Sequence, residues 1–293
     1  MSTLTPADAA DLFRRDPERF LDVGVGEVAY RRFGTVPDVL FVHGWPVSGA
    51  TFRTLLPHLA EHVTCHVIDL PGAGSSRFSP DTMLTVDTHI QSVRRVLDLL
   101  ELKDVAVVGH DSGGLIARHA VAGDPRVRAM GLINIEQSLG LSWRFKSFLA
   151  ARRTPGLSKG LGWVAGQRCI RRNSFLLGTA FADSSLLEGE FDEFFLKPLH
   201  DVPARRDAAI RLLRSFDLQH VRDLAEVHSR FTVPVQLVRG DKDPFSPLKW
   251  ANEMVGTFPD ARLEVVQGGG LFAHEERPAE VARALLSTLL GTR

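Results

Sequence analysis

The sequence feature that most constrains the fold is a sharp connection between a strand and a helix. It has the sequence Val107-Val108-Gly109-His110-Asp111-Ser112-Gly113-Gly114. The apolar run from Val105 to Val108 is typical of a buried strand, and it ends at a glycine. Polar residues and a Gly-Gly pair then lead into the apolar-periodic segment from Leu115 to Val121, which predicts a helix. Glycines on both sides of the turn allow a bend sharp enough to hold Asp111 above the sheet edge, at the helix N-terminus.

Strand and helix patterns alternate on both sides of this turn. Helices are expected over 51–59, 86–100 and 248–255, and strands over 27–33, 39–42, 64–70, 129–135, 235–239 and 263–266. This alternation predicts a mainly parallel sheet covered on both faces, with its active site beyond the carboxyl ends of the strands. Between about 137 and 230 the strand pattern stops. We therefore expect a main domain of residues 1–136 and 231–293 that carries an inserted helical cap, residues 137–230.

The turn around Asp111 resembles the nucleophile elbow of the α/β-hydrolase fold, G-x-S-x-G, with aspartate at its centre. An aspartate there resembles the haloalkane dehalogenase and epoxide hydrolase branch of that superfamily. The resemblance implies an α/β-hydrolase fold with a mainly parallel twisted sheet. It also implies attack by the carboxylate on an sp3 carbon that carries a leaving group, which leaves an ester on the enzyme. Two alternatives remain: Ser112 is the nucleophile of an elbow shifted by one residue, or the turn has no chemistry.

Two further loops match the same superfamily. His43-Gly44-Trp45-Pro46 follows the strand at 39–42 and resembles the oxyanion-hole loop. The resemblance implies that the backbone N–H groups of Trp45 and Ser112 face the developing negative charge. Asp243 lies in the G-x-x-D position after the strand at 235–239, which implies that it is the orienting acid, with Glu136 as an alternative.

The sequence departs from the superfamily where the catalytic histidine is expected. Relatives commonly read G-H-F-x-x-E-E-x-P, and this chain reads Gly270-Leu271-Phe272-Ala273-His274-Glu275-Glu276-Arg277-Pro278. Leu271 therefore occupies the histidine position, and the loop's histidine lies three residues later. Either His274 reaches across as a displaced base, or no group activates water. In the second case an ester on Asp111 persists, because its hydrolysis needs general-base help of about a hundredfold or more.

The groups that would meet the leaving group favour halide over epoxide chemistry. Related epoxide hydrolases protonate the epoxide oxygen with cap tyrosines, but the only tyrosine here is Tyr30, in the first predicted strand. A histidine of the cap would have to replace them: His200, His220 or His228. Dehalogenases hold the halide with N–H donors, and Trp45 and Trp143 carry candidate indole N–H groups. We therefore rank three candidate functions. The first is a haloalkane dehalogenase-like hydrolase and the second is an epoxide hydrolase. The third is a hydrolysis-impaired or ligand-binding protein that holds a small apolar molecule.

The amino-acid composition limits the classes of partner that this chain is expected to bind. The chain has 35 Lys plus Arg and 35 Asp plus Glu, so no net field attracts nucleic acid or a membrane. We see no targeting segment, no membrane-spanning run and no cysteine framework, which predicts a cytoplasmic protein. No metal-ligand spacing or cofactor motif is found. We expect a small apolar or weakly anionic organic substrate, water as co-substrate, and a monomer or homodimer.

One segment of the cap departs from this neutral composition. From Gln137 to Ala182 the chain contains eight Arg and Lys residues and no acid. This segment is either a solvated surface or an entrance that favours anionic substrates.

Overall fold

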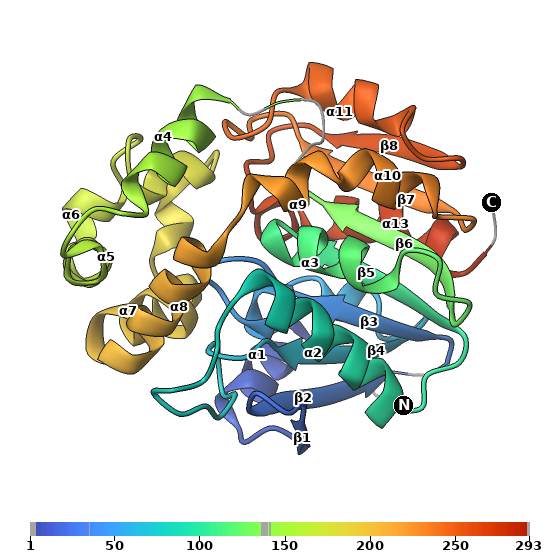
Figure 1. The fold of residues 1–293 in the computed structure, drawn as a ribbon, viewed down its shortest axis with the longest axis horizontal. Coiled ribbons are helices and arrows are strands. Elements are labelled where there is room, and N and C mark those ends of the chain that lie inside the picture. The colour runs from blue at the N-terminus through green and yellow to red at the C-terminus, as the bar shows by residue number, and fades with distance from the viewer. Residues whose placement is uncertain (1–3, 35, 136–139, 141, 292–293) are drawn as a thin grey trace.

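The computed structural model describes residues 4–34, 36–135, 140 and 142–291. These residues form one eight-stranded sheet with the order β1-β2-β4-β3-β5-β6-β7-β8 (Figure 1). The pairs β1–β2 and β2–β4 are antiparallel, and the other five pairs are parallel. The strands are β1 (Arg19–Asp22), β2 (Glu27–Gly34), β3 (Asp38–Val42), β4 (Thr64–Asp69), β5 (Val105–His110), β6 (Val127–Ile133), β7 (Val235–Gly240) and β8 (Ala261–Val266). The predicted mainly parallel sheet is confirmed.

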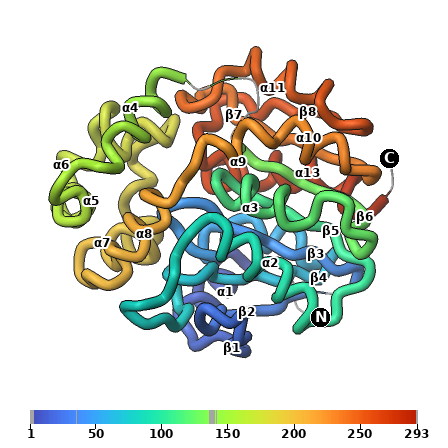
Figure 2. The backbone as a smooth tube through the Cα atoms, in the orientation of Figure 1, coloured from blue at the N-terminus to red at the C-terminus, as the bar shows by residue number. Residues whose placement is uncertain are grey.

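Helices cover both faces of the sheet, as the alternating pattern predicts (Figure 2). One apolar core joins the sheet to α2 (Val86–Leu99), α3 (Ser112–Val121), α10 (Leu224–Ser229) and α11 (Leu248–Val255). A second core joins the opposite face to α1 (Pro6–Arg14), α12 (Ala273–Glu276), α13 (Pro278–Leu289) and the 3-10 turns η1 (Gly49–Phe52) and η2 (Leu56–His58). The helix expected over 51–59 is therefore replaced by two separate 3-10 turns.

The central strands have the residues that burial on both faces requires. All six residues of β5 are buried, and this strand pairs with β3 on one side and β6 on the other. β-branched and small apolar side chains pack well in this position, which explains why β5 reads as a continuous apolar run. Because β3, β5, β6 and β7 run parallel as successive neighbours, the residues that follow them meet at one edge of the sheet.

A layer of helices lies beyond this edge, on the left of Figure 1. It comprises α4 (Trp143–Ala151), α5 (Leu157–Gly166), α6 (Arg168–Arg171), α7 (Lys197–Asp201), α8 (Pro203–Ser215) and the short turns η3 (Leu177–Ala180), η4 (Ser184–Leu187) and η5 (Asp192–Leu196). The remaining helices of the predicted cap, α9 (Leu218–Arg222) and α10, lie beside the sheet, and α10 packs against α3. The domain division at 137 and 230 stays a prediction. None of the helices in the described part of the chain has the length and apolarity needed to cross a bilayer.

Candidate active site

The strand-turn-helix connection predicted around Asp111 holds that residue in an unusual backbone conformation. Asp111 lies between β5 and α3 with φ 49° and ψ −133°, a region that residues with a side chain rarely adopt. The flanking glycines permit it. A Cβ atom at Gly109 would lie 2.6 Å from the Cα atom of Gly114, and one at Gly113 would lie 2.2 Å from the carbonyl oxygen of His43. The elbow therefore requires glycine at both positions, as the sequence pattern indicates.

Backbone donors hold one side of the Asp111 carboxylate. The Trp45 N–H donates to Oδ2 of Asp111 at 3.0 Å, and the backbone and side chain of Ser112 also hydrogen-bond to this carboxylate. Enclosure raises the pKa of Asp111 to about 6, because removing water penalises the charged form. The hydrogen bonds from Ser112 and Trp45 oppose this shift, and the negative charge of Asp243 adds to it.

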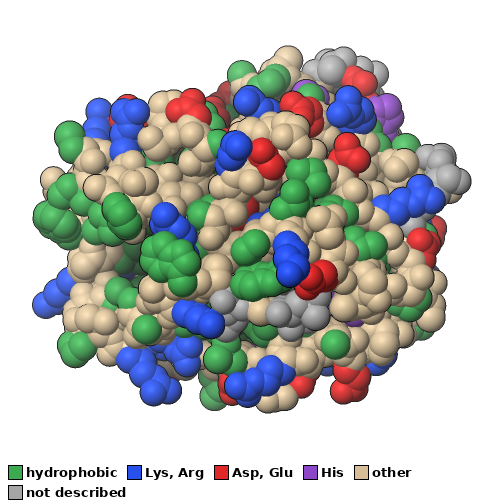
Figure 3. Space-filling view, turned by 90° about the horizontal axis from the view of Figure 1, so that it is seen from above, with side chains coloured by type: hydrophobic (Ala, Val, Ile, Leu, Met, Phe, Trp, Pro, Cys, Tyr) green, Lys and Arg blue, Asp and Glu red, His purple; other side chains and the backbone are tan. Residues whose placement is uncertain are grey.

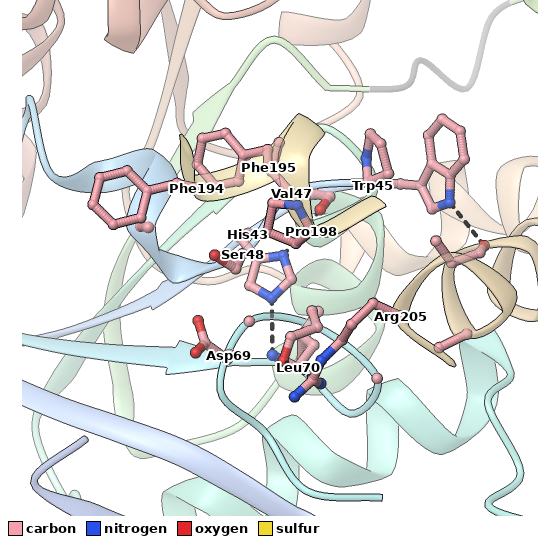
Figure 4. Close-up of a pocket in the computed structure, with 18 of the residues that line it drawn as sticks. His43, Trp45, Val47, Ser48, Asp69, Leu70, Phe194, Phe195, Pro198 and Arg205 are labelled. Carbon is pink, nitrogen blue, oxygen red and sulfur yellow. Dashed lines mark hydrogen bonds between the residues drawn. The ribbon is translucent and has the colours of Figure 1, made fainter. Parts of the chain in front are cut away.

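His43 fixes the loop that carries the Trp45 N–H. Its Nε2 atom accepts a hydrogen bond from the Leu70 N–H at 2.8 Å, so the proton is on Nδ1, which donates to the Gly44 carbonyl at 2.9 Å. Figure 4 shows His43 and Leu70 joined in this way beneath the loop. Burial also lowers the pKa of His43, which keeps the ring neutral and this tautomer in place.

The indole of Trp45 points away from the carboxylate. Its Nε1–H donates to the carbonyl of Ala209 in α8 at 2.8 Å (Figure 4). The indole N–H predicted to hold a halide is therefore used to join the loop to α8. Beneath this loop lies a cavity of about 230 Å³ whose wall includes Arg31, Asp69 and Arg205.

Asp111 opens onto a larger cavity of about 670 Å³ between the sheet edge and the layer of helices beyond it. Most of the side chains around it are apolar or aromatic, among them Phe148, Phe181, Phe191, Phe195, Ile210, Leu213, Phe216 and Phe245. A few polar residues join them, including Asn134, Asp243 and Ser246. The Ser246 hydroxyl is buried and, among the described residues, has no hydrogen-bond partner. Such a cavity suits a small apolar molecule that carries one polar group.

Asp243 lines the same cavity, and its charge is balanced by an arginine. Its Oδ2 atom lies 3.3 Å from Nη2 of Arg239 and accepts a hydrogen bond from Nδ2 of Asn134 at 3.0 Å. Its Oδ1 atom accepts the Phe245 N–H at 2.8 Å. No histidine is hydrogen-bonded to Asp243 in the described residues. The alternative acid, Glu136, lies outside the described residues.

Leu271 lines the cavity together with Asp111 and Asp243. Its backbone is held on both sides: its N–H donates to the Ala180 carbonyl at 2.8 Å, and its carbonyl lies 3.0 Å from Nε2 of His110. Burial lowers the pKa of His110 to about 3, so this ring is neutral and donates through Nε2–H. The elbow and the loop that carries Leu271 are thus fixed to each other.

His274 faces a different part of the molecule. The Thr51 hydroxyl donates to Glu275 at 3.1 Å, so it accepts from Nε2–H of His274 at 2.8 Å. The ring is fully buried against Phe52 and His110, and burial lowers its pKa well below the ordinary value. Among the described residues no hydrogen bond joins His274 to Asp243 or Asp111. The structure therefore does not bring the predicted displaced base to the site.

We predict that His274→Ala lowers the free energy of unfolding by about 2 to 4 kcal/mol, since it removes a buried ring and a hydrogen bond. The rate of any reaction at Asp111 should stay within about twofold of the wild-type rate. Denaturant unfolding and a rate measurement on the same preparation check this. A large loss of turnover with unchanged stability would instead identify His274 as the base.

The remaining side chains that the sequence singled out as candidates lie at the mouth of the cavity or away from it. Trp143 lines the mouth of the cavity, but its ring is mostly exposed and carries the Arg144 guanidinium on its face. Tyr30 hydrogen-bonds to His66 within the sheet. The three cap histidines have partners away from the cavity wall: His200 meets Gly162, His220 meets Asp87, and His228 meets Arg118 and Thr257.

Sequence reasoning missed three residues of this site. Asn134 follows one buried strand, Arg239 lies at the end of another, and Ser246 precedes a proline near the start of a predicted helix. The structure places Pro247 at the N-cap of α11 and leaves Ser246 among the residues that line the cavity. A charged residue at the end of the apolar strand β7, four positions before an acid, is the signal that could have identified Arg239.

A single sheet edge thus gathers a carboxylate with a raised pKa, two backbone donors and an apolar cavity. Within the described residues no group of three or more His, Cys, Asp or Glu side chains is placed to hold a metal ion. The arrangement supports attack by the carboxylate on an electrophile in the cavity.

Comparison with known proteins agrees with this geometry. Residues 39–284 match the alpha/beta hydrolase family. The chain is 25% identical over 270 residues to a haloalkane dehalogenase of Mesorhizobium japonicum, which covers 86% of this chain and 84% of that protein. It is 26% identical over 276 residues to a pimeloyl-acyl carrier protein methyl ester esterase of Xanthomonas campestris, covering 87% and 97%.

Among solved structures, the haloalkane dehalogenase DbeA from Bradyrhizobium elkani superposes with a TM-score of 0.78 at 22% identity, covering 93% of this chain and 97% of that one. The epoxide hydrolase CorEH superposes with a TM-score of 0.75 at 20% identity, covering 94% and 99%. The family match spans most of the chain and agrees with the sheet order and the elbow. The chain therefore belongs to the alpha/beta hydrolase family.

Proposed function

We propose that this protein is a haloalkane dehalogenase-like enzyme in which Asp111 displaces halide from an sp3 carbon and the resulting ester is hydrolysed very slowly. The main support for the proposal comes from the residues that surround Asp111. Its carboxylate is held by backbone N–H groups at the floor of an apolar cavity, and Leu271 stands where a base is expected. The similarity of the chain to the haloalkane dehalogenase of Mesorhizobium japonicum supports the first step.

In the first step the carboxylate attacks carbon. The Trp45 N–H fixes Oδ2, which leaves the other carboxylate oxygen to attack. A carbon–oxygen bond forms while the carbon–halogen bond breaks, and the electron pair of that bond leaves with the halide ion. The dry cavity favours this step, because charge spreads from the carboxylate over the reacting atoms and the halide.

The second step needs water and a base. Water attack on the ester carbonyl would place a negative charge on Oδ2, opposite the Trp45 and Ser112 N–H groups. No histidine is hydrogen-bonded to Asp243 in the described residues, and Leu271 offers no proton acceptor. Hydrolysis of the ester should therefore be slower by about a hundredfold or more than with a positioned base, the usual size of a general-base contribution.

The leaving halide needs a donor, and Ser246 is the best candidate in the cavity wall. Its buried hydroxyl has no partner among the described residues, whereas the Trp45 indole is already used by Ala209. A hydroxyl left without a partner in an apolar wall costs free energy that a bound halide or a polar substrate group would offset.

Two other functions have weaker support. Epoxide hydrolysis agrees with the likeness to CorEH, but among the described residues no histidine or tyrosine lines the cavity to protonate an epoxide oxygen. Simple ligand binding agrees with Leu271, but it gives no reason to enclose the Asp111 carboxylate at a cost in solvation.

Intact-mass spectrometry after incubation with a panel of alkyl halides and epoxides tests the three functions. We expect a stable mass increase equal to the alkyl group of the halide less the hydrogen that it replaces, with one equivalent of halide released. Rapid turnover without an adduct would mean that a base is present after all. An adduct from epoxides alone would favour the epoxide alternative. Unchanged mass across the panel with no halide released and no epoxide consumed would favour the binder.

We predict that the rate of adduct formation depends on pH through the pKa of Asp111, which is about 6. Only the ionised carboxylate attacks, so the rate should be constant above about pH 7 and fall to about a tenth of that value at pH 5. The initial rate of mass increase between pH 5 and pH 8 measures this. A rate that stays level down to pH 4.5 would show that the carboxylate is not shielded from water.

A further inference from the structure

The mouth of the large cavity is surrounded by exposed aromatic side chains. Trp143, Trp163 and Phe175 are 64%, 55% and 77% exposed, and all three line the cavity. They come from the start of α4, from α5 and from the segment before η3, so they converge on one opening from separate parts of the cap. A group of exposed apolar side chains around one opening, bordered by polar residues, is typical of an interaction surface.

Basic side chains accompany these rings. The Arg144 guanidinium lies 4.8 Å from the Trp143 ring centre and 5.9 Å from that of Phe175, so it bridges two of the three. Further exposed basic residues in the same acid-free segment are Lys146, Arg153, Lys159 and Arg168, whereas Arg172 is paired with Glu188 at 3.3 Å. In Figure 3 hydrophobic and basic side chains are mixed over the cap at the left of the molecule. The zero net charge of the chain therefore conceals a cap surface that is locally positive.

We propose that this aromatic and basic surface of the cap, named here the cap face, docks on an anionic lipid membrane. Tryptophan and phenylalanine insert well at the level of lipid headgroups, and lysine and arginine are attracted to anionic lipids. The whole-chain charge predicted no membrane partner, but docking depends on the charge that faces the surface. The Debye length, about 8 Å at physiological salt, makes distant acids on the main domain irrelevant.

A lipid surface fits the cap face better than an acidic protein does. The rings stand apart around an opening, and a fluid bilayer can surround each of them, whereas a protein partner needs a continuous complementary surface. The opening also leads into an apolar cavity. Docking would let an apolar compound dissolved in the bilayer pass into the cavity without crossing water, which defines the substrate source as membrane-partitioned organic molecules.

Membrane docking would place the proposed enzyme at the source of its substrate and so rests on the proposed function. Vesicle binding can be measured without any reaction at Asp111. The full chain is mixed with vesicles of pure phosphatidylcholine, or with vesicles that contain about a third phosphatidylglycerol, and bound protein is separated by flotation. We expect binding to the anionic vesicles that falls steeply as salt rises. If vesicles bind and no substrate alkylates Asp111, only the proposed function fails.

Two pairs of variants examine the cap face. Trp143→Ala with Phe175→Ala should weaken binding by about tenfold or more, because two aromatic side chains no longer leave water. Lys146→Glu with Lys159→Glu should also weaken it by about tenfold or more. The charge control is Arg95→Glu with Lys103→Glu, which changes net charge equally on exposed residues of the main domain. Melting temperatures verify that each variant is folded.

The outcomes separate the possibilities. Weakening by both cap pairs but not by the control supports docking. Absence of binding to anionic vesicles at low salt overturns it, as does an equal loss in the control pair, which would mean unspecific attraction. Binding to polyglutamate but not to vesicles also overturns it and identifies an acidic protein as the partner of the cap face.

Discussion

Leu271→His is expected to raise the rate of ester hydrolysis by about a hundredfold or more and to turn a one-time alkylation into turnover. The leucine side chain lies in the wall of the same cavity as Asp111 and Asp243. An imidazole in its place would supply the proton acceptor that water needs. The measurement is the lifetime of the mass adduct, together with the number of halide ions released per protein.

The site can orient such a histidine. Oδ2 of Asp243 is taken up by Arg239 and Asn134, but Oδ1 accepts only the Phe245 N–H among the described residues. A carboxylate oxygen has a second lone pair, which an imidazole N–H can use. The Leu271 backbone is already fixed by hydrogen bonds to Ala180 and His110, so the substitution need not reorganise the loop.

Controls distinguish base catalysis from a change in cavity shape. Leu271→Phe changes the volume without adding a base and should leave the adduct stable. Adding Asp243→Asn to Leu271→His should remove much of the gain, because the orienting charge is lost. If Leu271→His forms an adduct that is as stable as that of the wild-type protein, the loop does not direct this position at the ester, and our alignment of the histidine position is wrong.

Asp111→Asn is expected to abolish both the adduct and any turnover, a loss of at least about a thousandfold, since an amide oxygen is a poor nucleophile for carbon. Ser112→Ala keeps the backbone N–H and should still form the adduct, which makes it the matched control. Activity retained in Asp111→Asn and lost in Ser112→Ala would establish the shifted elbow, with Ser112 as nucleophile. Adduct mass and its position by peptide mapping are the measurements.

The same variant should be more stable than the wild-type protein at neutral pH. The pKa of Asp111 is raised to about 6 in the folded chain, above its ordinary value of 3.8, so the ionised carboxylate destabilises the fold. This cost is absent below about pH 4 and complete above about pH 6. Asp111→Asn should therefore add about 1 to 3 kcal/mol to the free energy of unfolding at pH 7.5 and little at pH 4. A variant that is less stable at pH 7.5 would show that the ionised group stabilises the fold.

The sequence by itself determined the parts of this protein that depend on local pattern. A buried apolar run, then glycines, then an apolar-periodic segment is compatible with few structures. The order of β5, the elbow and α3 could therefore be predicted, although β5 extends to His110 and α3 begins at Ser112. The alternation of strands and helices determined the parallel sheet. Because parallel strands end at one edge, it also placed the loops of Asp111, Asp243 and Leu271 around one cavity.

Only the tertiary structure decided where the side chains of these loops point. His274 turns to Thr51, and the Trp45 indole turns to Ala209, a partner 164 residues away in the chain. Asn134, which is 109 residues away in the chain, donates to the Asp243 carboxylate beside Arg239. Periodicity records which face of an element is apolar. The direction of a buried polar side chain is set by which donors and acceptors the packed fold brings within about 3 Å of it, and those come from distant segments.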